Sequence, residues 1–62
     1  MVVKIVDEKF TEALGELEVE YNGEIYHIVY YVDNKDEYHF FYEDGKKPEN
    51  YPDFENEIIR RL

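Results

Sequence analysis

The sequence predicts an α+β fold: a small three- or four-stranded antiparallel sheet with a C-terminal helix and a short helix near residues 8–14. Three patterns indicate this fold. From Glu16 to Tyr21 acidic and apolar residues alternate, which is the period of a half-buried strand. Asn22-Gly23 follows, and Asn-Gly between two such runs is the strongest short-range signal for a β-hairpin. Near the end of the chain, a one-sided helical stripe is formed by Phe54, Ile58 and Leu62.

The N-terminal part of the chain has two interpretations after a first short strand, which the β-branched residues of Val2 to Val6 predict. In the first, Asp7 caps a helix over Glu8–Leu14, whose apolar residues recur at helical spacing, and Gly15 ends that helix. In the second, the strand continues through Phe10 and the chain turns at Thr11–Gly15. Both interpretations place Phe10 and Leu14 in the core.

The register of the hairpin follows from its turn, because a two-residue turn at Asn22-Gly23 pairs Tyr21 with Glu24. Counting back from the turn places Glu20 opposite Ile25, Glu18 opposite His27 and Glu16 opposite Val29. The other face then holds the apolar residues that we expect to form the core: Leu17, Val19, Tyr21, Tyr26, Ile28 and Tyr30.

A further strand is expected over Glu37–Glu43, but the loop before it does not determine which of its faces points to the core. We favour the face with Tyr38, Phe40 and Tyr42. The final helix is expected to begin near Pro52, with acidic residues in its first turns and Arg60-Arg61 in its last, an order that suits the helix dipole. Glu57 and Arg61 form a favourable i,i+4 pair.

Length and composition indicate one small acidic domain, residues 1–62, without cysteine. A domain of this size buries only about 60% of the surface of its unfolded chain, so an aromatic content of 18% matters for its core. The N-terminus lacks the apolar stretch of a signal peptide, and no apolar run approaches the length of a membrane span. These features predict a cytoplasmic, soluble protein.

The formal net charge of −9 is large for 62 residues and is unevenly distributed. Acids dominate from Asp7 to Glu24 and again from Asp33 to Gly45, whereas the segment from Lys46 onward is balanced. A negative field repels nucleic acid and anionic membranes and favours encounters with basic proteins. We therefore expect no direct nucleic-acid or membrane binding and a basic protein surface as the partner. The alternative is that the excess acid only keeps a small protein soluble.

Catalytic and ligand-binding patterns are largely absent from the sequence, so we expect no enzyme and no cofactor. The chain has neither serine nor cysteine, and its only threonine, Thr11, has no histidine or glycine-rich loop nearby. The three glycines are isolated, which gives no phosphate cradle. His27 and His39 would either point to opposite faces or lie roughly 13 Å apart. We therefore predict no metal site.

The predicted site is the mixed face of the hairpin, where apolar residues have an acidic margin, a layout typical of protein interfaces. Alternate glutamates on a strand are spaced by about 6.6 Å, the order of successive phosphates along a DNA strand. This composition is similar to that of small acidic inhibitors of DNA- or RNA-binding proteins, common in phages and mobile elements. The alternatives are a homodimer formed through this sheet face, or a face covered by the N-terminal elements. The expected partner-binding residues are Glu16, Glu18, Glu20, Ile25, His27, Val29 and Tyr31.

Overall fold

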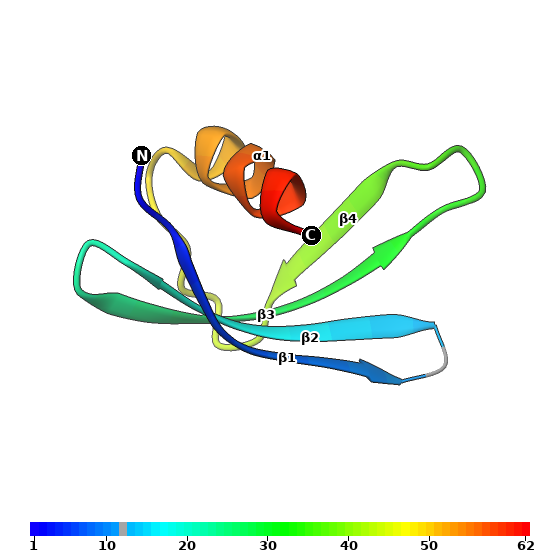
Figure 1. Ribbon diagram of the computed structural model, residues 1–62, viewed down its shortest axis with the longest axis horizontal. Coiled ribbons are helices and arrows are strands. Elements are labelled where there is room, and N and C mark those ends of the chain that lie inside the picture. Colours follow the sequence, from blue (N-terminus) through cyan, green and yellow to red (C-terminus); the bar gives the residue numbers. More distant parts are fainter. Residues whose placement is uncertain (12) are drawn as a thin grey trace.

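The computed structural model describes residues 1–11 and 13–62 as a four-stranded antiparallel open sheet followed by one helix (Figure 1), which confirms the predicted fold class. The strands lie in the sheet in chain order, β1-β2-β3-β4, so β1 and β4 form its two edges. The elements are β1 (Lys4–Thr11), β2 (Leu14–Tyr21), β3 (Glu24–Val32), β4 (Tyr38–Tyr42) and α1 (Tyr51–Arg61).

The short helix predicted near residues 8–14 is wrong, because the described residues of this segment belong to β1 and β2. Residue 12 lies outside the described residues. The second interpretation, a strand through Phe10, is the nearer one. A helix of two turns is marginal by itself, whereas β1 gains main-chain hydrogen bonds by pairing with β2 from Lys4 to Thr11.

The hairpin of β2 and β3 has the register that the sequence predicts, with Glu20 opposite Ile25, Glu18 opposite His27 and Glu16 opposite Val29. Its turn has positive φ at both central residues, 52° at Asn22 and 76° at Gly23. Residues other than Asn, Asp and Gly rarely adopt this backbone conformation. The Asn-Gly pair therefore fixes the position of the turn, and with it which residues face the core.

β4 pairs with β3 so that Val32 lies opposite Tyr38 and Tyr30 opposite Phe40. This register puts Tyr38, Phe40 and Tyr42 against the core, which confirms the favoured face. The same register places His39 opposite Tyr31, on the face that carries His27 but four residues away along β3.

The helix α1 packs against one face of the sheet through Phe54 and Ile58, which are both fully buried (Figure 1). It begins at Tyr51, one residue before the expected start, and Arg61 pairs with Glu57 at 3.3 Å. Leu62 follows the helix and is 40% exposed, so it is a marginal member of the predicted stripe. The buried core consists of Val3, Leu17, Val19, Tyr26, Ile28, Tyr30, Phe54 and Ile58.

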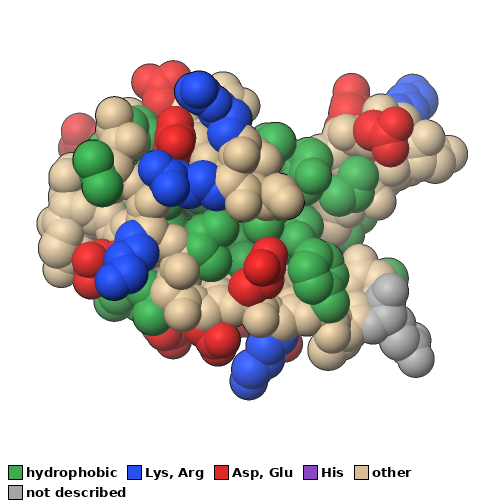
Figure 2. Space-filling view, viewed as in Figure 1, with side chains coloured by type: hydrophobic (Ala, Val, Ile, Leu, Met, Phe, Trp, Pro, Cys, Tyr) green, Lys and Arg blue, Asp and Glu red, His purple; other side chains and the backbone are tan. Residues whose placement is uncertain are grey.

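The helix covers only part of its face of the sheet, because its 11 residues span about 16 Å and strands of 8 or 9 residues span about 28 Å. The paired ends of β1 and β2 and the hairpin end of β3 and β4 extend beyond the helix. Apolar side chains gather between these two ends (Figures 1 and 2). Phe10 is 71% exposed and Leu14 is 42% exposed, so the expectation that both are core residues is wrong. Phe10 instead packs edge-on against Tyr30 across Gly15.

Candidate interaction surface

The outer face is the name we give to the side of the sheet opposite α1. Strand alternation puts all seven predicted partner-binding residues on this face, because the register pairs the three glutamates of β2 with Ile25, His27 and Val29 of β3. No other element lies over the outer face among the described residues, since β1 continues the sheet beside β2 and α1 lies on the opposite side (Figure 1). The alternative in which N-terminal elements cover this face is therefore wrong.

The apolar part of the outer face extends further than the sequence indicated. Tyr31 is 37% exposed, and its ring stacks on His39 with centroids 4.7 Å apart and on Phe41 at 6.1 Å. Phe41 is itself 56% exposed. His39 and Phe41 were missed because their facing depends on the loop between β3 and β4, which leaves the register open. We call Ile25, Val29, Tyr31 and Phe41 the apolar strip.

The glutamate row on β2 is flanked by charged residues of β1. Lys4 lies opposite Glu20 and Lys9 opposite Glu16, whereas Asp7 lies opposite Glu18. A bulge between Ile5 and Asp7 sets this alignment, since it inserts one extra residue into β1. The two lysines therefore moderate both ends of the row, and the negative charge is concentrated around Glu18. Acidic and basic side chains line the lower margin of the molecule in Figure 2.

A shallow, open hollow of about 160 Å³ lies at the centre of this charge, beside His27. His27 Nδ1 is 3.6 Å from Glu18 Oε1, and both side chains remain nearly half exposed. The register of β4 adds Glu43, whose backbone N–H donates to the carbonyl oxygen of His27 at 3.0 Å. The ionisable residues lining the hollow are Asp7, Lys9, Glu16, Glu18, His27 and Glu43. Such a site attracts a cationic side chain.

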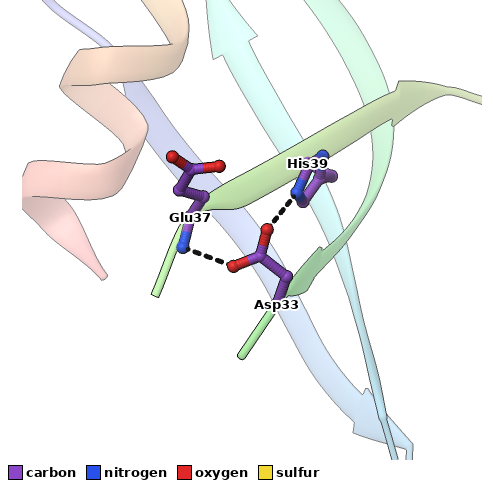
Figure 3. A group of neighbouring side chains, drawn as sticks. All are labelled: Asp33, Glu37 and His39. Atoms are coloured by element: carbon purple, nitrogen blue, oxygen red, sulfur yellow. Dashed lines mark hydrogen bonds and ion pairs between the residues drawn. The ribbon is translucent and has the colours of Figure 1, made fainter. Parts of the chain in front are cut away.

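A second polar group lies at the loop between β3 and β4, where Asp33, Glu37 and His39 place ligand atoms within 4.8 Å of one another (Figure 3). Asp33 Oδ1 accepts hydrogen bonds from the backbone N–H groups of Lys35 and Glu37, and Oδ2 accepts one from His39 Nε2 at 2.8 Å. The bond from His39, followed by those backbone bonds, lowers the pKa of Asp33.

These hydrogen bonds indicate that the group stabilises the loop between β3 and β4. Asp33 holds the loop closed and fixes the ring of His39, because an ionised carboxylate can only accept and Nε2 must then carry the proton. In Figure 3 the dashed line from Glu37 begins at its backbone nitrogen, and none joins its carboxylate to Asp33 or His39. A carboxylate pair with one imidazole is a donor set that a divalent cation accepts, but here two of its three members already bind each other. From the sequence we considered His27 with His39 and His27 with Glu18 as metal ligands, and this group was missed.

Comparison with known proteins finds no matching family model, no similar curated protein and no similar solved structure. Within the described residues, no helix is long and apolar enough to cross a membrane. The outer face is therefore the structural feature from which a function can be inferred.

Proposed function

We propose that the protein is a non-catalytic interaction module whose outer face binds a basic protein surface. The observation that carries this proposal is the acidic hollow at His27, which lies on a face that no other described element covers. Beside it is the apolar strip, in which Tyr31 and Phe41 are exposed. Interfaces between proteins combine such parts: apolar groups supply buried area, and charges at the margin steer association and select the partner. A lysine or arginine of the partner fits the hollow, and its apolar residues fit the strip.

One form of this function is inhibition of a DNA- or RNA-binding protein by occupation of its nucleic-acid site. Glu16, Glu18 and Glu20 project from one side of β2 at intervals of about 6.6 Å, comparable to the spacing of phosphates along one strand. A basic groove that binds a phosphate backbone is complementary to such a row. This form predicts that the protein competes with nucleic acid for its partner.

The rival function is that of a structural or oligomerisation domain whose apolar strip is buried in a homodimer. The exposure of Tyr31 and Phe41 favours it, since large exposed apolar residues that cluster mark interaction sites. Stacking two outer faces, however, would also bring two sets of carboxylates together at the hollow. Because like charges that are forced together and desolvated oppose association, we rank this function second.

The test is affinity capture from a lysate of the source cell, with the protein immobilised and salt varied from about 50 to about 500 mM. The variant carries Lys in place of Glu16, Glu18 and Glu20. Its matched control carries Lys in place of the exposed loop residues Glu37, Asp44 and Glu49, so that both have the same net charge.

We expect a partner that the parent and the control retain, that the triple variant loses and that high salt releases. The captured protein should be basic, and nucleic acid should displace it if the inhibitor form is right. A partner that binds equally well to all three proteins, or equally at both salt concentrations, would contradict the proposal.

A further inference from the structure

We propose that a second copy of this chain pairs with the free edge of β4, antiparallel and about a twofold axis, so that the two sheets become one. β4 is an edge strand with β3 on one side only. A protein with such an edge either protects it or uses it, because its unpaired main-chain groups form a template for another strand.

The free groups of this edge can be assigned from the hydrogen bonds at its two ends. The N–H of Glu43 donates to the carbonyl of His27 at 3.0 Å, and the N–H of Asp33 donates to the carbonyl of Glu37 at 2.9 Å. Main-chain groups alternate in direction along a strand, so the odd-numbered residues of β4 bond to β3. The outward-pointing N–H groups therefore belong to Tyr38, Phe40 and Tyr42. The carbonyl of Tyr42 already accepts a hydrogen bond from the N–H of Gly45 at 3.0 Å, so the outward-pointing carbonyls left for a second strand are those of Tyr38 and Phe40.

The opposite edge of the sheet, β1, is protected in two ways that β4 lacks. β1 carries charged side chains on both of its faces, and the bulge between Ile5 and Asp7 interrupts its ladder. Charges and bulges are the usual means by which natural sheets prevent edge-to-edge pairing. β4 has no lysine, no acid and no register shift along its five residues, Tyr-His-Phe-Phe-Tyr.

Charge favours a second copy at this edge over the basic partner proposed for the outer face. A basic surface is attracted to the hollow at His27, and β4 itself offers that surface no carboxylate. Two copies with a net charge of −9 each repel one another, and Glu37 and Glu43, which flank β4, add to this repulsion at the ends of the paired strands. The repulsion is least along the five uncharged residues of β4 itself. Antiparallel pairing of this strand with itself places aromatic side chains opposite one another on both faces of the sheet.

The two associations respond to salt in opposite directions, which separates this proposal from the proposed function. Screening weakens the attraction of a basic partner to the outer face, and it also weakens the repulsion between two acidic copies. Self-association through β4 should therefore increase with salt, whereas capture of a basic partner should decrease. Either result can fail without the other.

The experiment combines sedimentation with residue-resolved amide hydrogen exchange of the whole chain at two salt concentrations. We expect a dimer whose fraction rises with protein concentration and with salt. The amides of Tyr38, Phe40 and Tyr42 should become protected as the dimer forms. Exclusively monomeric protein up to about 0.5 mM at both salt concentrations would overturn the proposal, since even weak edge pairing is detected there.

A variant with its own control tests the site. Phe41→Lys places a charge on β4 at a position that is 56% exposed, and Val2→Lys makes the same charge change at a position that is 82% exposed, outside β4. The first should weaken dimerisation at least tenfold and the second should not. Equal effects of the two variants, or a dimer that leaves the three amides of the unmodified protein unprotected, would assign the association to another surface and reject the proposal.

Discussion

The two faces of the sheet are formed by alternate residues of the same strands, yet they differ in exposure, charge and covering. On the side of α1, neighbouring positions of β2 and β3 such as Val19 and Ile28 are completely buried. Their immediate neighbours in the chain, Glu18 and Val29, lie on the outer face, which no described element covers. A period of two thus gives one hairpin both a folding surface and an exposed surface of different chemistry.

This difference teaches that stability and binding can be changed separately in this small domain. Residues on the helix side should control the free energy of unfolding, because their apolar area is already removed from water. Residues of the outer face should control association, because they gain new contacts only when a partner arrives. Substitutions that act on one face at a time therefore test that separation.

Truncation of the helix anchor should have the largest effect. Phe54 is fully buried and its ring lies 5.2 Å from that of Tyr21 and 5.3 Å from that of Tyr26. Phe54→Ala should cost about 3–5 kcal/mol, which is most of the stability that a core of this size provides. Val29→Ala on the outer face should cost less than about 1 kcal/mol. Urea denaturation followed by circular dichroism measures both, and equal losses would mean that the faces are not distinct.

Substitution in the turn between β2 and β3 should have the second-largest effect on stability. This turn determines which residues lie on each face. Gly23 has a φ of 76°, so Gly23→Val places a β-branched side chain in a left-handed conformation, at a cost of about 1–3 kcal/mol. Space is not the cause, because a Cβ at Gly23 would meet no other atom within 4 Å. Gly23→Asn is the control and should cost much less, since Asn tolerates this conformation. The melting temperatures of both variants test this prediction. An unchanged melting temperature of the valine variant would mean that the hairpin has a different register.

Alkaline pH should lower the free energy of unfolding through the tyrosines on the helix side of the sheet. Burial, together with a 2.7 Å hydrogen bond donated to Glu55, raises the pKa of Tyr42, and burial also raises the pKa values of Tyr26 and Tyr30. In the unfolded chain a tyrosine ionises near pH 10, so the free energy of unfolding should be steady below about pH 10 and fall above it. Denaturation at stepped pH measures this slope. Tyr42→Phe should reduce it, and an unchanged slope would contradict the assignment to Tyr42.

The glutamate row should contribute least to stability. In the variant with Lys at residues 16, 18 and 20, two positions would lie opposite Lys4 and Lys9, whereas the middle position would gain Asp7 as an opposite charge. Exposed cross-strand pairs are worth about 0.2–1 kcal/mol each; two pairs become unfavourable and one becomes favourable, so the net loss of stability should be small. The variant should melt within a few degrees of the parent. Extensive unfolding would show that the row stabilises the fold, and the binding test would then need single substitutions.

Sequence patterns were sufficient for the parts of the fold that local chemistry determines. Asn22-Gly23 fixes its hairpin because few other residues adopt the turn, and the stripe of Phe54 and Ile58 describes a helix that buries one side. Strand alternation then placed Glu18 opposite His27. Each of these inferences needs information from a few neighbouring residues only.

The parts that failed depend on long-range pairing. The segment from residue 8 to residue 14 is so short that its apolar residues fit both a helical and a strand period. Pairing with β2 favours the strand. Phe10 is exposed because α1 is too short to reach it, which no local pattern reveals. The positions of Lys4 and Lys9 beside the glutamate row and of Phe41 beside Tyr31 likewise follow from registers that the loops leave open.

The most direct test of the account measures the exposure of the two faces in dilute solution by nuclear magnetic resonance with a soluble paramagnetic probe. The methyl groups of Ile25 and Val29 on the outer face should relax strongly. Those of Val19 and Ile28, their neighbours in the same two strands, should be protected. Equal protection of all four residues at a concentration where the protein is monomeric would show that the outer face is covered, and would contradict its assignment as a binding surface.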